Sequence, residues 1–274
     1  MCTWKELHDM WKAADDIDVW ESGWTFDHFE PILGFPRDHD CLEGWMTLAA
    51  LLHSTTRLRG GVLVSGMVYR HPAVLANMAA TLDITSGGRL ELGLGAGWNT
   101  DECDAYGIEL GSVRERCDRF EEGLEVIKLL LTQPQSTYTG THFQLNGAYC
   151  NPKPIQKPYP PICIGGGGEK RTLKMVAKYA DHWNFASGEP DPIPAFRHKR
   201  AVLEEHCAAI GRDPKTILIS ALIFGRSLTQ QQAVELAHRY SEEGVGLGIV
   251  STPRPLNPRD LETYAEALRP LTSS

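Results

Sequence analysis

Short apolar runs alternate with helical stretches along this chain, and that alternation constrains its fold more than any other feature. Strands are predicted at residues 21–26, 58–65, 90–95, 162–164, 182–186, 217–224 and 245–250. Helices are predicted at residues 3–15, 71–85, 113–131, 193–210, 230–242 and 259–268, with another that ends at residue 179. Strands and helices that take turns in this way predict βα units around a parallel sheet.

The seven predicted strands are one short of a closed (β/α)8 barrel, which begins with a strand and needs eight. This chain begins inside its first predicted helix instead. One absent strand would leave two unpaired edges in the barrel wall. We therefore expect about ten residues upstream of Met1 to supply that strand. The alternative is a strand that the pattern fails to reveal.

Composition and charge argue against several classes of protein. The chain is 42% hydrophobic and 23% charged, as in ordinary globular proteins. Its net charge of −8, without a basic block, argues against nucleic acid as a partner. No apolar run is long enough to span a membrane, and no secretory signal is visible. The seven cysteines form no C-x-x-C pair, so we expect reduced thiols and a cytoplasmic location.

Four consecutive glycines, Gly165–Gly168, stand between a predicted strand and a helix. Glycine lets backbone N–H groups approach a ligand closely, and a helix N-terminus favours a phosphate or carboxylate there. Lys170 and Arg171, expected in the first turn of the helix, add positive charge. The run therefore predicts an anion-binding loop, with a plain flexible loop or tight turn as the alternative.

Three other strand ends carry candidate site residues, because function collects at the C-terminal ends of barrel strands. Asp27 and His28 follow the first strand, and a histidine there can exchange a proton near neutral pH or simply cap a loop. The segment 62–65 is mostly apolar and is followed by Gly66, and the segment 95–98 contains two glycines and a tryptophan. Strand ends without bulky side chains predict a large planar ligand across the barrel mouth, with its phosphate held by Gly165–Gly168.

Most catalytic motifs are missing from the sequence. It contains no Ser-His-Asp spacing, no H-E-x-x-H, no metal-binding cluster and no lysine at a predicted strand end. Such sparse side-chain chemistry predicts a bound cofactor that performs the difficult step.

Several stretches of the sequence together resemble the luciferase-like monooxygenase superfamily, specifically its branch that depends on coenzyme F420, a deazaflavin. They are Trp24–Phe29, Tyr69–Ala73, Ser86–Trp98, Cys150–Pro154 and Ile162–Arg171. The resemblance runs from about residue 3 to residue 270. It implies a single (β/α)8 barrel domain over residues 1–274, of the bacterial luciferase-like type, with a small insertion near residues 135–160. The strand that opens family members is absent here.

The resemblance also implies a set of cofactor-binding residues. Asp27 and His28 match positions that contact the deazaflavin ring or transfer protons, and Val62-Leu63 matches a non-prolyl cis peptide behind the ring. The phosphate loop matches Gly165–Gly168 with Glu169. The full predicted set is Asp27, His28, Val62, Leu63, Val64, Ser65, Gly95, Ala96, Gly97, Trp98, Gly165, Gly166, Gly167, Gly168 and Glu169. Trp98 stands where sugar-phosphate dehydrogenases of the branch carry a carboxylate, which argues against a glucose-6-phosphate substrate.

The function that follows is hydride transfer between C5 of F420 and an unidentified small organic substrate, with His28 as the acid/base. One alternative keeps the fold but uses FMN, as a monooxygenase supplied by a separate reductase. Another is a non-catalytic flavin-binding barrel, for which the absent strand is the main argument. Members of the superfamily often form homodimers, and a reductase would supply reduced cofactor.

Overall fold

The computed structural model describes residues 3–32, 34–252 and 254–272, apart from the side chain of residue 226. These residues fall into two compact units. The middle unit comprises residues 24–53 and 59–162, and the terminal unit comprises residues 1–23, 54–58 and 163–274. Within each unit, strands and helices alternate as the sequence predicts. A single domain over the whole chain stays a prediction.

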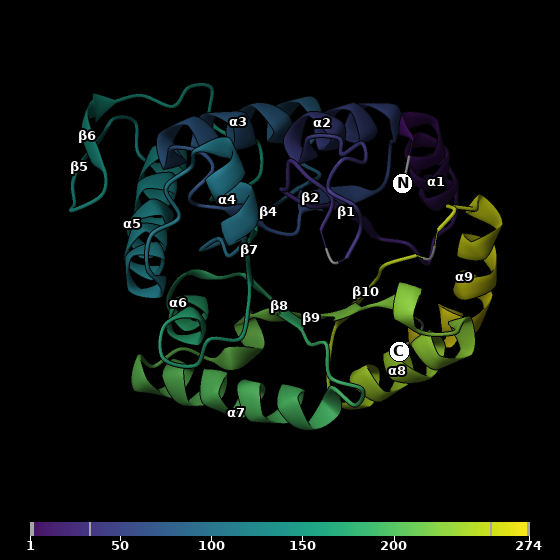
Figure 1. The fold of residues 1–274 in the computed structure, drawn as a ribbon. Coiled ribbons are helices and arrows are strands. Elements are labelled where there is room, and N and C mark those ends of the chain that lie inside the picture. The colour runs from purple at the N-terminus through teal and green to yellow at the C-terminus, as the bar shows by residue number, and fades with distance from the viewer. Residues whose placement is uncertain (1–2, 33, 253, 273–274) are drawn as a thin grey trace. The chain divides into compact units, whose positions relative to one another are not determined.

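Parallel strands form the centre of the middle unit (Figure 1). Strand β2 (Arg59–Val62) pairs with β4 (Leu90–Gly95), and the two-residue strand β3 (Ser65–Gly66) pairs with β4 further along. Strand β1 (Ser22–Thr25) is the neighbour of β2 in the sheet. Every residue of β4 is buried, as is typical of a central strand in a parallel sheet.

The strand predicted over residues 58–65 is wrong as a continuous element. Gly60 pairs with Leu90 but Ser65 pairs with Leu94, so one extra residue stands between the two pairings, as in a β-bulge. The physical reason is a change of partner, because the Leu63 N–H donates to the Thr25 carbonyl of β1 (2.7 Å). The cis peptide joins Leu63 and Val64, one bond beyond the predicted Val62–Leu63 position.

The helices of the middle unit were only partly predicted. Helices α3 (Pro72–Thr85) and α5 (Val113–Thr132) agree with the prediction to within one residue and pack on each other (Figure 1). Helices α2 (Gly44–Ser54) and α4 (Thr100–Tyr106) were missed, since α2 is apolar on most of its faces and α4 is short. Strands β5 (Ser136–Thr139) and β6 (Gln144–Ala148) form an antiparallel hairpin within the stretch where the resemblance implies an insertion.

The terminal unit contains four neighbouring parallel strands, all of which the sequence predicts. They are β7 (Ile162–Gly165, from residue 163 onward), β8 (His182–Ala186), β9 (Leu218–Ile223) and β10 (Leu247–Val250). An aromatic cluster of Trp183, Phe185, Phe196 and Tyr240, with ring centroids 5.3–6.4 Å apart, packs in its core. These strands are therefore buried against helices, as βα units require.

The helices of the terminal unit connect its strands and bring distant parts of the chain together. They are α1 (Trp4–Asp16), α6 (Thr172–Tyr179), α7 (Ile193–Ala209), α8 (Gln230–Glu242) and α9 (Pro258–Thr272), with short 3-10 helices at Pro214–Thr216 and Gly225–Ser227. Helix α1 lies beside α9, from the other end of the sequence (Figure 1). In the part of the chain that the structure describes, no strand precedes α1, as the sequence predicts.

Asp15 ties residues 54–58 to the terminal unit. Its buried carboxylate accepts hydrogen bonds from the backbone N–H groups of Thr56, Arg57 and Leu58 at 2.7–2.8 Å. Burial acts in the opposite direction, but these bonds lower the pKa of Asp15 to about 2. The charged carboxylate therefore stabilises the turn that leads into β2.

None of the described helices is long and apolar enough to cross a membrane.

Candidate functional site

A buried histidine and carboxylate meet at the C-terminal ends of strands in the middle unit. His28 follows β1 by three residues, and its Nδ1 lies 2.8 Å from Oε2 of Glu102, at the start of α4 after β4. The exposed fractions of the two residues are only 7% and 1%. Such a pair can hold an imidazole in one orientation and stabilise its charged form.

Glu102 forms four hydrogen bonds with described residues. Besides His28, the Tyr69 hydroxyl donates to Oε2 (2.6 Å), and the backbone N–H groups of Phe29 and Glu30 donate to Oε1 (2.6 and 3.2 Å). Burial alone would favour the neutral acid, but these hydrogen bonds together lower the pKa of Glu102. The carboxylate is therefore ionised at neutral pH. Burial and Glu102 in turn raise the pKa of the Tyr69 hydroxyl, which stays a donor.

Asp27, next to His28, has one paired and one unpaired oxygen. Its Oδ2 accepts from Nη1 of Arg70 at 2.6 Å, and Arg70 also donates to Glu43. None of the described residues hydrogen-bonds Oδ1, although the residue is 1% exposed. Burial raises the pKa of Asp27 in spite of Arg70. An unpaired buried acceptor is uncommon in native proteins, and a hydrogen-bond donor on a bound ligand would satisfy it.

Arg70→Met is expected to destabilise the protein by about 3–5 kcal/mol, because it leaves the Asp27 carboxylate buried without its ion-pair partner. The free energy of unfolding, from urea titrations at neutral pH, measures this loss. In the double variant with Asp27→Asn, where the charge is absent, we expect much of the stability to return. A loss below about 1 kcal/mol in the single variant would contradict the buried ion pair.

Of the other predicted residues of the middle unit, Val64 contacts Gly95 and Trp98 lies beside His28. The Val64 side chain packs against Gly95, where a Cβ would stand only 2.7 Å from its Cγ2. Gly97 has a φ of +85°, and after it the Trp98 ring lies edge-on to His28 with centroids 5.4 Å apart. Trp98 is 56% exposed, which is unusual for tryptophan and leaves a flat apolar surface beside His28.

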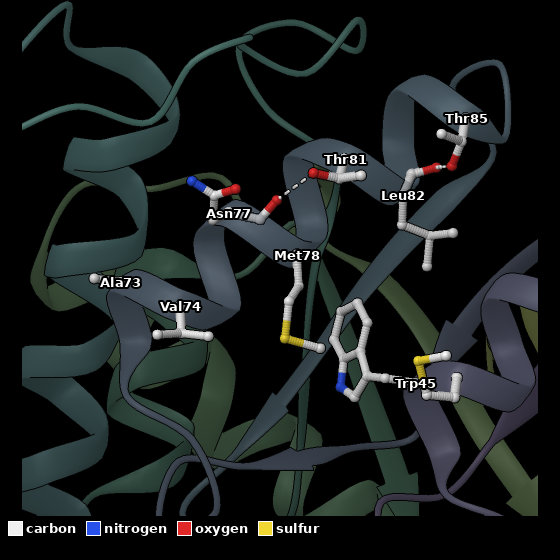
Figure 2. Close-up of a pocket in the computed structure, with 9 residues that line it drawn as sticks. Trp45, Ala73, Val74, Asn77, Met78, Thr81, Leu82 and Thr85 are labelled. Atoms are coloured by element: carbon white, nitrogen blue, oxygen red, sulfur yellow. Dashed lines mark hydrogen bonds between the residues drawn. The ribbon is translucent and has the colours of Figure 1, made fainter.

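Residues of α2 and α3, Trp45 among them, line an apolar pocket (Figure 2). Trp45 donates its indole N–H to the buried Ser65 hydroxyl (2.6 Å), and Met78 of α3 points toward the same ring. None of the predicted site residues lines this pocket, which has a volume of about 580 Å³. The pocket is therefore separate from the candidate site.

The glycine loop lies in the terminal unit, and only its last three glycines follow β7. Gly166 has a φ of +116°, and Gly166 and Gly168 are exposed. Helix α6 begins at Thr172, so Lys170 and Arg171 precede the helix, and their predicted place in its first turn is wrong. The reason is the turn at residues 169–171, which the chain needs before it becomes helical.

Glu169 is held by side chains of α7. Its Oε1 accepts from Nζ of Lys199 (2.5 Å) and lies 3.0 Å from His198 Nε2, and these contacts lower its pKa. Lys199 also passes along Gly167, where a Cβ would lie 3.7 Å from its Cε. The glycine loop thus has a lysine beside it that the sequence did not single out. Contact between Glu169 and a cofactor stays a prediction.

Sequence reasoning missed Glu102, Tyr69 and Arg70 as members of the candidate site. Tyr69 and Arg70 lie in a stretch that carried the resemblance but received no role. Glu102 sits three residues after Asn99, whose side chain caps α4. A carboxylate in the first turn of a helix that follows a glycine-rich strand end is a signal that could have identified it.

The family model described as luciferase-like monooxygenase matches residues 4–270 of this chain. An F420-dependent hydroxymycolic acid dehydrogenase of Mycobacterium tuberculosis is 28% identical over 245 residues, which are 89% of this chain and 64% of that protein. An uncharacterized protein of the same organism is 34% identical over 172 residues, which are 63% of this chain and 58% of that protein. This chain thus spans less than two thirds of the length of either relative.

A solved structure of an F420-dependent secondary alcohol dehydrogenase, in complex with an F420-acetone adduct, is similar in fold. Its TM-score is 0.82 at 18% identity, and the match covers 98% of this chain and 94% of that one. At this identity the likeness concerns the fold alone. It confirms the predicted fold class, an α/β barrel of the bacterial luciferase-like type.

Proposed function

This chain belongs to the luciferase-like monooxygenase family, a family of enzymes, and we propose that it is an F420-dependent oxidoreductase. The proposed substrate is a small organic molecule with a hydroxyl or carbonyl group. The observation that carries the proposal is the buried His28–Glu102 pair at strand ends of the middle unit. A dehydrogenase needs such an acid/base, because a proton leaves or enters the substrate oxygen when a hydride moves.

The residues of the middle unit fit one end of a deazaflavin. Val64, Gly95 and Trp98 offer apolar surface, and Asp27 Oδ1 is an acceptor without a donor among the described residues. We propose separately that the glycine loop of the terminal unit binds a phosphate through the backbone N–H groups of Gly167 and Gly168, because the Gly166 N–H already donates to the Asn184 carbonyl (3.3 Å) and Lys199 to Glu169. When bound, the deazaflavin supplies a two-electron hydride acceptor or donor at C5. His28 then exchanges a proton with the substrate, and the apolar side chains around it exclude water.

Two relatives support the choice of cofactor and substrate class. The hydroxymycolic acid dehydrogenase is named as F420-dependent, and the fold of the secondary alcohol dehydrogenase was determined with an F420 adduct. Both names describe proteins that act on a hydroxyl group. The rival, an FMN-dependent monooxygenase with a separate reductase, is favoured by the name of the family.

Spectral titration of the purified protein separates the two cofactors. We expect saturable binding of F420 and at least about tenfold weaker binding of FMN, a difference of ~1.4 kcal/mol. A parallel titration uses a fragment of F420 that has the chromophore but lacks the phosphate. It tests the glycine loop, because only binding of the phosphate should depend on that loop. Tight FMN binding without a response to F420 would overturn the cofactor assignment. Oxygen consumption with reduced FMN would then support the monooxygenase.

A further inference from the structure

We propose that Glu102 is a positioning residue that fixes the proton of neutral His28 on Nδ1. Nε2 is then the atom that exchanges a proton with the substrate. The assignment of the proton rests on hydrogen-bond geometry alone, whereas its part in catalysis rests on the function proposed above. Nothing in the family match or in the relatives' names assigns a role to Glu102.

The first step is that Glu102 can only accept. Its two oxygens receive three donors, namely two backbone N–H groups on Oε1 and the Tyr69 hydroxyl on Oε2. A carboxylate has about four lone-pair directions, so one remains to accept a hydrogen bond, and His28 Nδ1 lies 2.8 Å from Oε2. With its pKa lowered by these bonds, Glu102 carries no proton to donate to His28. The hydrogen between Nδ1 and Oε2 therefore belongs to the imidazole.

The second step concerns the other ring nitrogen. Among the residues that the structure describes, Glu102 is the sole hydrogen-bond partner of the His28 ring. A neutral imidazole with its proton on Nδ1 has a lone pair on Nε2. Trp98, Tyr69 and Phe26 surround the ring at centroid distances of 5.4–6.4 Å and fix its plane. Nε2 is thus left as a base in an aromatic setting.

The chemical consequence is a defined direction for the proton. When a substrate hydroxyl is oxidised, its O–H bond breaks and the proton forms a bond to Nε2. A bound deazaflavin would supply the acceptor for the hydride of the carbon–hydrogen bond, so that the two electrons and the one proton lost as the carbonyl forms are accounted for. Glu102 stabilises the resulting imidazolium through the same 2.8 Å contact.

Glu102→Gln should reverse the position of the proton. The two backbone N–H groups on Oε1 can be accepted only by the amide oxygen of glutamine. The amide nitrogen must then face His28 and donate to Nδ1, which moves the ring proton to Nε2. Tyr69→Phe is the matched control, because it removes one donor to Glu102 and leaves the His28 contact intact.

Nitrogen-15 NMR of the ten histidines shows which ring nitrogen carries the proton. The spectra are recorded at about pH 9, where an ordinary imidazole is neutral. His28 is assigned from the signals lost in His28→Ala. We expect a protonated-type shift at Nδ1 and a lone-pair-type shift at Nε2 in the wild type and in Tyr69→Phe, and the reverse in Glu102→Gln. A wild-type ring protonated on Nε2, or one unchanged in Glu102→Gln, overturns the proposal.

The spectra of the wild type and of Tyr69→Phe decide the matter even where Glu102→Gln does not fold. Steady-state turnover tests the part of Glu102 in catalysis. We expect kcat of Glu102→Gln to fall roughly 10²–10⁴-fold, while its F420 affinity stays within about threefold of the wild type. If the wild type neither binds nor turns over F420, the proposed function fails while the NMR result still stands or falls by itself.

Discussion

His28→Ala is expected to lower kcat by about 10³-fold and to leave F420 affinity within about threefold of the wild type. The reason is that His28 is buried and that, among the described residues, only one nitrogen of its ring has a hydrogen-bond partner. The other nitrogen can exchange a proton. Removing the imidazole takes away the group that we propose exchanges the substrate proton. Trp98 and Asp27, which we expect to contact the cofactor, stay in place.

Steady-state kinetics and the titration described above measure the two effects separately. His53→Ala is a suitable control, since His53 is exposed in the last turn of α2 and belongs to no part of the site. We expect its kcat to match the wild type within about twofold. If His28→Ala weakens F420 binding as much as it lowers kcat, His28 holds the cofactor instead. Unchanged turnover would remove it from the mechanism.

The location of the candidate residues could be predicted because strand ends are a local property of the sequence. Strand β4 occupies Leu90–Gly95 and strand β8 occupies His182–Ala186, both as predicted. Each is a short apolar run with a helix on either side. In a parallel sheet the carboxyl ends of such runs lie along one edge. That rule places Asp27, His28 and Gly95–Trp98 on the same side of the middle unit.

The partners of these residues could not be predicted in the same way. Glu102 is 74 positions from His28 in the sequence, and Arg70 is 43 positions from Asp27. Ion pairs and hydrogen bonds over such separations depend on packing, which no local pattern reveals. The cis peptide bulge at Leu63–Val64 was predicted by the family resemblance, one bond too early, but the pattern of residues 58–65 predicted a continuous strand because it does not reveal the hydrogen bond from Leu63 to β1.

Gly93→Ala is expected to cost about 3–5 kcal/mol in the free energy of unfolding, the largest stability effect of a single methyl group that we predict. Gly93 is buried in the middle of β4, and a Cβ there would lie 1.9 Å from the Val62 carbonyl oxygen. The carbonyl oxygen belongs to the backbone and the new Cβ is bonded directly to it, so rotation of a side chain cannot relieve the clash. Strands β2 and β4 would have to separate.

The separation would act on the candidate site because Val62 immediately precedes the bulge that carries Val64. Urea unfolding measures the loss of stability, and F420 titration of the folded fraction should show weaker binding as Val64 moves from Gly95. Gly188→Ala is the matched control: Gly188 is exposed, has ordinary backbone angles and has no atom within 4 Å of the place its new methyl group would take, so we expect a change below about 0.5 kcal/mol. Equal stability of the two variants would mean that close contact between β2 and β4 does not hold Val64 beside Gly95.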